Sequence, residues 1–224
     1  MRKIIVALIL LAVVLVILDR VAVTGVQNEV ARQIAAKYDL DNTPTVEVKG
    51  IPFLTQAISG HYDEVEISMG PMTHEGVKLA AVDARLIGVN AQLNDLLATN
   101  AEITADKVTG TVVISRQTVA DRAPEGIKIE GNGDDSLRVS GSVVVGDIKV
   151  PVTADMRLRV VSGGIRLVPE HVKAGNINVP RATRVLGWTV PVKDLPLNMK
   201  ITKVTTTGSG LAVEGSATDV PLKG

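Results

Sequence analysis

The stretch Thr45-Val-Glu-Val-Lys-Gly-Ile-Pro-Phe-Leu-Thr-Gln-Ala-Ile-Ser-Gly-His-Tyr62 contains clear strand, turn and helix signals. In Val46–Lys49, valines alternate with charged residues, which predicts a half-buried strand. Pro52 lacks a backbone donor and should end that strand. The apolar residues of Phe53–Ile58 are spaced as one face of a short helical turn, and Gly60 can adopt the positive φ that ends it. A second alternating run follows directly, so the sequence predicts two strands joined by an apolar corner.

This stretch resembles the actinobacterial LmeA-like phospholipid-binding family. The matching residues are Val46–Gln56 and Gly60–Tyr62, followed further along the chain by Leu86–Val89. The resemblance also extends to an apolar N-terminal helix and a β-rich body of similar length. It implies a cell-envelope protein that binds phospholipid, with a fold like that of the tubular lipid-binding (BPI-like) proteins.

The composition predicts an aliphatic protein without nucleic-acid partners. Hydrophobic residues make up 46% of the 224 residues but aromatic residues only 2%, so the core must consist mainly of Val, Ile, Leu and Ala. The 24 basic and 24 acidic residues cancel, whereas a nucleic-acid-binding protein usually has a basic excess. The chain has no cysteine, which excludes disulfides, a thiol nucleophile and a lipidated cysteine.

The N-terminus has the pattern of a membrane anchor. Met1–Lys3 is basic, and Ile4–Leu18 is an unbroken run of 15 apolar residues, about 22 Å long as a helix. Because Ala22–Thr24 is a poor cleavage site, we expect residues 1–24 to remain as an uncleaved anchor, although a cleaved signal peptide stays open. The positive-inside rule places residues 25–224, expected to be one β-rich domain, at the outer face of the cytoplasmic membrane or in the periplasmic space.

A second helical pattern follows the anchor. Val26, Val30, Ile34 and Tyr38 recur at every fourth residue, which predicts an amphipathic helix. Gly25 should weaken the helix by about 1 kcal/mol and form a hinge between the membrane segment and the body. The valine stripe either packs against the sheet or closes one side of a lipid cavity.

The rest of the chain alternates between strands and turns. The clearest strand is Val152–Val160, which places Val152, Ala154, Met156, Leu158 and Val160 on one face and charged residues on the other. Short helices are expected at 115–123 and 180–188. The predicted fold class is therefore α+β, with a membrane helix and an amphipathic helix packed on a curved, mostly antiparallel β-sheet body.

Catalytic and metal-binding motifs are lacking in the sequence. His61, His74 and His171 have no partner at metal-ligand spacing, and there is neither a nucleophile elbow nor a phosphate-binding loop. We therefore expect a protein that is not an enzyme and that has no cofactor, catalytic residue or metal site.

An aliphatic sheet that curves around itself can line a lipid tube, although the same residues can also fill a core. The resemblance favours phospholipid binding that holds, senses or exchanges lipid in support of envelope lipid or lipoglycan maintenance. The alternative is an envelope scaffold that carries no lipid and interacts with a membrane-bound biosynthetic enzyme. The expected partners are phospholipid, the membrane and such an enzyme. The candidate lipid-binding residues are Phe53, Leu54, Ile58, Met156, Leu158, Leu186 and Trp188, and the candidate head-group residues are Arg181 and Arg184.

Overall fold

The computed structural model describes most of the chain: residues 2–74, 77–92, 102–130, 137–145, 148–162, 164–173, 186–192 and 199–223. The chain divides into two compact units, each assembled from segments that are distant in the sequence. Unit 1 consists of Met1–Gly70, Asp83–Gly110 and Ala217–Gly224, and unit 2 of Pro71–Val82 and Thr111–Ser216. The predicted α+β class is confirmed, with a long apolar N-terminal helix and antiparallel sheets.

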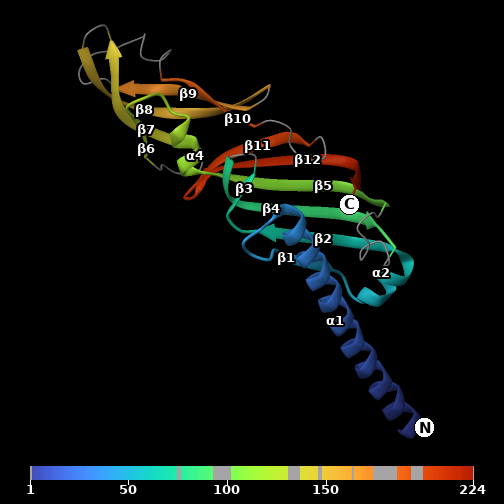
Figure 1. Ribbon diagram of the computed structural model, residues 1–224. Coiled ribbons are helices and arrows are strands. Elements are labelled where there is room, and N and C mark those ends of the chain that lie inside the picture. Colours follow the sequence, from blue (N-terminus) through green and yellow to red (C-terminus); the bar gives the residue numbers. More distant parts are fainter. Residues whose placement is uncertain are drawn as a thin grey trace. The chain divides into compact units, whose positions relative to one another are not determined.

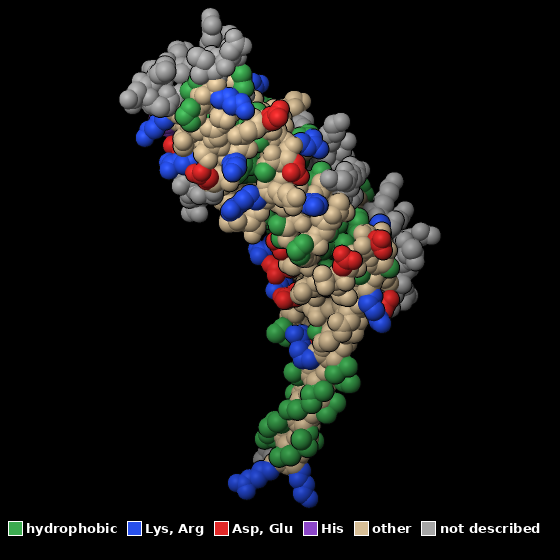
Figure 2. All heavy atoms as spheres, turned by 60° about the vertical axis from the view of Figure 1, so that its left-hand side comes forward, with side chains coloured by type: hydrophobic (Ala, Val, Ile, Leu, Met, Phe, Trp, Pro, Cys, Tyr) green, Lys and Arg blue, Asp and Glu red, His purple; other side chains and the backbone are tan. Residues whose placement is uncertain are grey.

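Unit 1 contains one long helix, α1 (Arg2–Tyr38), of 37 residues, which corresponds to about 55 Å. All side chains from 2 to 18 are exposed, and burial begins at Asp19, followed by Val23 and Ala31 on the same side of the helix. Figure 1 shows this N-terminal half projecting away from the sheet of unit 1. In Figure 2 it is a continuous apolar surface that ends in basic side chains. α1 therefore has an exposed apolar half and a half that packs on the body.

The helix continues through Gly25 without a break, so the predicted hinge is not present and the two predicted helices are one. Val26, Val30 and Ile34 are half-buried as expected, whereas Tyr38 is exposed. The predicted domain boundary after residue 24 falls inside α1. With a mean hydropathy of 3.0 in its most apolar window, α1 is long and apolar enough to cross a membrane, a property that signal sequences share.

The predicted strand–corner–strand unit is confirmed. It consists of β1 (Thr45–Lys49), α2 (Phe53–Ser59) and β2 (His61–Met69). β1 and β2 pair antiparallel with Val46 opposite Ile67 and Val48 opposite Val65, so these aliphatic side chains share one face. The second strand starts at His61, directly after the helix, earlier than its alternation at Val65 indicates.

A seven-stranded sheet extends from this hairpin in the order β1-β2-β4-β5-β12-β11, with β3 beside β4. The long strands β4, β5 and β12 each contribute residues to both units. The further members of this sheet are β3 (Met72–His74), β4 (Val77–Asn90), β5 (Glu102–Ser115), β11 (Lys200–Thr207) and β12 (Gly210–Lys223).

Unit 2 contains a second, five-stranded sheet in the order β10-β9-β8-β7-β6, in which all neighbours are antiparallel. The short helix α4 (Arg116–Asp121) begins at Ser115, whose side chain caps the Thr118 amide. The strands of this sheet are β6 (Ile127–Glu130), β7 (Leu137–Val145), β8 (Ile148–Val161), β9 (Gly164–Lys173) and β10 (Trp188–Pro191).

Two predictions about unit 2 have different outcomes. α4 confirms the predicted helix at 115–123. The predicted helix at 180–188 lies mostly outside the described residues, and its last residue, Trp188, is the first residue of β10. Trp188 has a strand conformation because it pairs with Leu167 in β9, and this pairing is long-range information that a local apolar pattern does not contain.

The turn between β11 and β12 provides a test of close packing in unit 2. A Cβ atom at Gly210 would lie 1.8 Å from the carbonyl oxygen of Ile114, whereas one at Gly208 would meet no atom within 4 Å. We expect Gly210→Ala to lower the free energy of unfolding by about 1–3 kcal/mol or more. Gly208→Ala in the same turn should change it by less than about 0.5 kcal/mol. Denaturant unfolding followed by the fluorescence of Trp188, the only tryptophan, measures both, and equal stability of the two variants would contradict the packing.

Candidate functional site

The corner around α2 is held to the long helix by Asp19. Pro52, the residue before the helix, has no side-chain oxygen to cap it, and α2 lacks a side-chain cap of its own. Instead the backbone N–H of Leu54 donates to Asp19 Oδ1 at 2.8 Å, while Arg20 donates to the other carboxylate oxygen. A carboxylate at a helix N-terminus satisfies a free donor and interacts favourably with the helix dipole. Asp19 therefore acts as the cap of α2 from another helix.

Gln56 joins the two strands that leave the corner. Its side-chain Nε2 donates to the Lys49 carbonyl at 3.1 Å, and its Oε1 accepts from the Asp63 N–H at 3.0 Å. The Gln56 side chain comes so close to the backbone that position 50 must be glycine. There φ is +93°, and a Cβ would lie 2.6 Å from Gln56 Nε2. Gly60, with φ +69°, ends α2 by donating to the Gln56 carbonyl. Gly50, Gln56 and Gly60 thus build the corner that connects β1 to β2.

Phe53 and Tyr62 form the interior of the corner. Both are 1% exposed, and their ring centroids are 6.1 Å apart. Burial raises the pKa of the Tyr62 phenol, and its hydroxyl has no hydrogen-bond partner in the part of the chain that the structure describes. A buried hydroxyl without a partner costs about 1–3 kcal/mol. The corner is therefore a packed core in which the Tyr62 hydroxyl is left without a partner among the described residues.

The run Leu86–Val89, which also carries the family resemblance, lies in β4 of unit 1. Gly88 has φ +62°, and a Cβ there would lie 2.1 Å from a carboxylate oxygen of Asp106. This conformation interrupts the strand alternation, so that Leu86 and Val89 are both buried. The glycine is required by the backbone and by the neighbouring carboxylate.

The β1–β2 hairpin carries charged side chains on the face opposite to Val46 and Val48. Glu66 accepts from Lys49 at 2.8 Å and from Arg85 at 2.6 Å, and these two cations lower the pKa of its carboxyl. Because the three side chains are partly exposed, this ion-pair network indicates that the charged face of the hairpin is in contact with solvent.

The five-stranded sheet of unit 2 presents an apolar face formed by rows of cross-strand partners. The rows are Ile129–Val139–Ala154–Val172, Leu137–Met156–Pro169, Leu158–Leu167–Trp188 and Val160–Ile165–Val190. Most of these side chains are buried and form one cluster with Val119 of α4 and with Leu211 and Val213 of β12. The cluster is almost purely aliphatic, as the composition predicts.

One end of this face is less covered than the rest. Leu158 is half-buried and Val160 is 50% exposed, whereas their partners Leu167 and Ile165 are completely buried. Trp188, in the row of Leu158, is 8% exposed, and among the described residues its indole N–H has no hydrogen-bond partner. We call the end of the apolar face that carries Leu158, Val160 and Trp188 its edge. This edge is partly exposed, and it includes a buried indole N–H that has no partner in the described chain.

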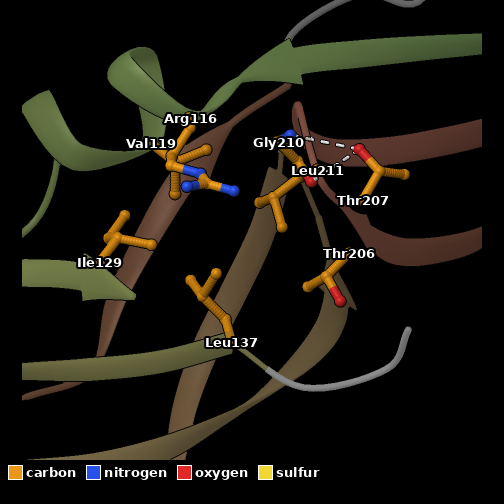
Figure 3. Close-up of a pocket in the computed structure, with 8 residues that line it drawn as sticks. All are labelled: Arg116, Val119, Ile129, Leu137, Thr206, Thr207, Gly210 and Leu211. Carbon is orange, nitrogen blue, oxygen red and sulfur yellow. Dashed lines mark hydrogen bonds between the residues drawn. The ribbon is translucent and has the colours of Figure 1, made fainter. Parts of the chain in front are cut away.

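Figure 3 shows a cavity between α4, β6, β7 and the β11–β12 turn. Its volume is about 10 Å³, and it is lined by Arg116, Val119, Ile129, Leu137, Thr206, Thr207, Gly210 and Leu211. A cavity needs about 10–15 Å³ to hold one water molecule. This cavity is therefore too small for an acyl chain.

The predicted site residues fall into two groups. Phe53, Leu54 and Ile58 lie in unit 1, where Phe53 is buried, Leu54 is half-buried and Ile58 is 88% exposed. The other four lipid-binding candidates, Met156, Leu158, Leu186 and Trp188, lie together in or against the apolar cluster of unit 2. Arg181 and Arg184, the predicted head-group residues, lie outside the described residues.

Sequence reasoning missed the polar residues of the corner. Asp19 was visible as the residue that interrupts the apolar run, but its partner is 35 residues away. Gln56 belongs to the stretch Thr45–Tyr62, yet no local pattern indicates that its amide forms hydrogen bonds with both strands. Within the described ranges, no group of three or more His, Asp and Glu residues is arranged to hold a metal ion.

The packing of the corner can be tested by truncation. We expect Phe53→Ala to lower the free energy of unfolding by about 3–5 kcal/mol, because it removes a fully buried ring. Ile58→Ala, in the same helix, should change it by less than about 0.5 kcal/mol because that side chain is exposed. Thermal unfolding followed by circular dichroism compares the two. A stable Phe53→Ala variant would show that the corner is an ordinary surface loop.

The cap can be tested with two substitutions of Asp19. Asp19→Ala leaves the Leu54 N–H without an acceptor and should cost about 1–2 kcal/mol, as the loss of a helix cap does. Asp19→Asn keeps an acceptor oxygen and should cost less. Hydrogen exchange of the Leu54 amide reports the bond directly. Unchanged protection of this amide in Asp19→Ala would contradict the cap.

No curated protein and no solved structure matches the chain. A family model described as LmeA-like phospholipid-binding matches residues 17–216, a range that includes the corner, Leu86–Val89 and the apolar face of unit 2. The chain therefore belongs to the LmeA-like phospholipid-binding family.

Proposed function

We propose that the protein binds phospholipid at the outer face of the cytoplasmic membrane. In this proposal α1 anchors the chain in the bilayer through Ile4–Leu18, and lipid contacts the apolar face of the five-stranded sheet at the edge formed by Leu158, Val160 and Trp188. The family supports phospholipid binding. The exposed apolar half of α1 supports membrane attachment.

The observation that carries the location is the indole N–H of Trp188. It is buried in an aliphatic cluster and has no partner among the described residues. Buried polar groups in proteins are almost always hydrogen-bonded, so an unpaired one calls for an explanation. An ester or phosphate oxygen of a lipid whose chain lies along Leu158 would satisfy the donor. The same residue type, with an apolar body and one donor, is common where apolar and polar phases meet.

The energetics favour reversible lipid binding over tight storage. Burying acyl chains stabilises a complex by about 0.8 kcal/mol per methylene relative to water. The lipid comes from a bilayer, however, where its chains are already buried, so that this contribution nearly cancels. The net affinity then depends on a few polar contacts such as the one proposed for Trp188. A protein of this kind suits holding, sensing or exchanging lipid in envelope maintenance.

The alternative is a scaffold that carries no lipid and interacts with a membrane-bound envelope enzyme. The small cavity of Figure 3 favours it, because about 10 Å³ is consistent with a filled core in that part of unit 2. The two functions make opposite predictions for the partly exposed edge at Leu158.

The experiment compares lipid carried by the purified full chain with that carried by two variants. Native mass spectrometry and lipid extraction measure the bound phospholipid. Trp188→Phe removes the unpaired donor and keeps an aromatic ring, so bound lipid should fall without loss of the folded state. Tyr62→Phe is the matched control. It removes the Tyr62 hydroxyl, which is also buried and unpaired among the described residues but lies in unit 1, and it should leave bound lipid unchanged. Loss of lipid in Tyr62→Phe alone would place the site in unit 1.

Leu158→Trp separates the lipid protein from the scaffold. If the edge accommodates lipid, the larger side chain occupies that space, and lipid uptake falls while stability holds. If the core is filled, overpacking should cost about 1–3 kcal/mol. Arg159→Ala on the charged face should change neither property. An unfolded Leu158→Trp variant, together with wild-type protein free of lipid, would contradict phospholipid binding at this face.

A further inference from the structure

We propose that the corner of residues 51–59 is a second membrane contact, in which Ile51 and Ile58 insert into the interface of the bilayer that α1 crosses. This inference rests on the membrane location of α1 given above. It assigns to α2 the role of an interfacial helix.

The first observation is the exposure of these two side chains. Ile51 is 80% and Ile58 is 88% exposed, more than any other large hydrophobic residue among those that the structure describes, including those of the apolar half of α1. One exposed aliphatic side chain is common on protein surfaces. Here two such side chains belong to the same short corner, and the described chain leaves both of them largely uncovered.

The second observation is the composition of the corner. From Gly50 to Gly60 the chain contains no charged residue, and the nearest are Lys49 and Asp63. The helix has two sides: Phe53, Gln56 and Ala57 are buried, while Ile58 points outward. A corner without charged residues and with exposed apolar side chains is suited to the interface, where interfacial helices bury their apolar face about 5–10 Å deep.

The third observation is the position of the corner along α1. Asp19 directly follows the last residue of the apolar run, and it accepts the N–H of Leu54 at 2.8 Å. Figure 1 shows α2 beside α1 at the point where the helix leaves the sheet of unit 1. Since one helical turn spans about 5.4 Å, the start of α2 lies within about one turn of the level where the apolar segment ends. The interface is therefore within reach of Ile51 and Ile58.

These observations select the bilayer as the occupant. A protein partner or a second copy would also cover apolar side chains, but only the bilayer is already placed at this level by α1. The exposed Val21, just beyond Arg20, extends the apolar surface of the helix toward the same level. Two contacts, one through α1 and one through the corner, restrict the tilt of unit 1 on the membrane, which a single helix does not.

The absence of cysteine allows a direct test with single labels. Full-length Ile51→Cys and Ile58→Cys variants carry an environment-sensitive fluorophore in vesicles of equal parts phosphatidylglycerol and phosphatidylethanolamine. The control is Tyr38→Cys, an exposed position at the C-terminal end of α1, which lies about 28 Å beyond Asp19 along the helix axis. Spin-labelled lipids should quench the labels at 51 and 58 roughly twofold more than the label at 38, with a blue shift of emission.

Carbonate extraction of the same vesicles separates this inference from the proposed anchor. Protein that resists extraction but shows equal quenching at 58 and 38 overturns the membrane contact and leaves the anchor in place. Protein that carbonate releases overturns the anchor and this inference together. A blue shift without quenching by spin-labelled lipid indicates contact with protein instead, either a partner or a second copy, and also overturns the proposal.

Discussion

The hydrogen bond between the Leu54 N–H and Asp19 Oδ1 connects the apolar helix to the folded body. α2 follows a proline, so its first turn has no capping oxygen of its own. The carboxylate that supplies it comes from the first buried residue of α1. A buried carboxylate is costly unless it is paired, and this one has both the amide and the Arg20 guanidinium as partners. The position of the corner along the long helix is therefore determined by electrostatics as well as by apolar packing.

The residues that carry the family resemblance have structural roles. Gly50 makes room for the Gln56 amide, and Gly60 ends α2 in a left-handed conformation. Gly88 accommodates the Asp106 carboxylate in the same way. Each of these glycines has a positive φ, and a Cβ at Gly50 or Gly88 would clash with a neighbouring side chain, so the backbone itself requires them. This explains why a short motif identifies the family without indicating a mechanism.

Among the described residues, two buried donors have no hydrogen-bond partner: the hydroxyl of Tyr62 and the indole N–H of Trp188. They belong to different compact units. Lipid binding from a bilayer gains little from burying acyl chains, so a small number of polar contacts can decide the affinity and the location. The chain has few aromatic residues, and one of them is at the partly exposed edge of the apolar face.

The elements that depend on local patterns followed from the sequence alone: the apolar helix, the strand–corner–strand unit, the alternation of Val152–Val160 and the short helix after Ser115. Periodicity and turn residues are local properties, and these elements formed as expected. The tertiary structure decided what depends on distant partners. It made one helix through Gly25, because packing of the C-terminal half of α1 on β1 and α2 outweighs the modest cost of a glycine. It placed Trp188 in a strand by pairing it with Leu167, and it left Ile58 at the surface because only one side of a short helix can face the core.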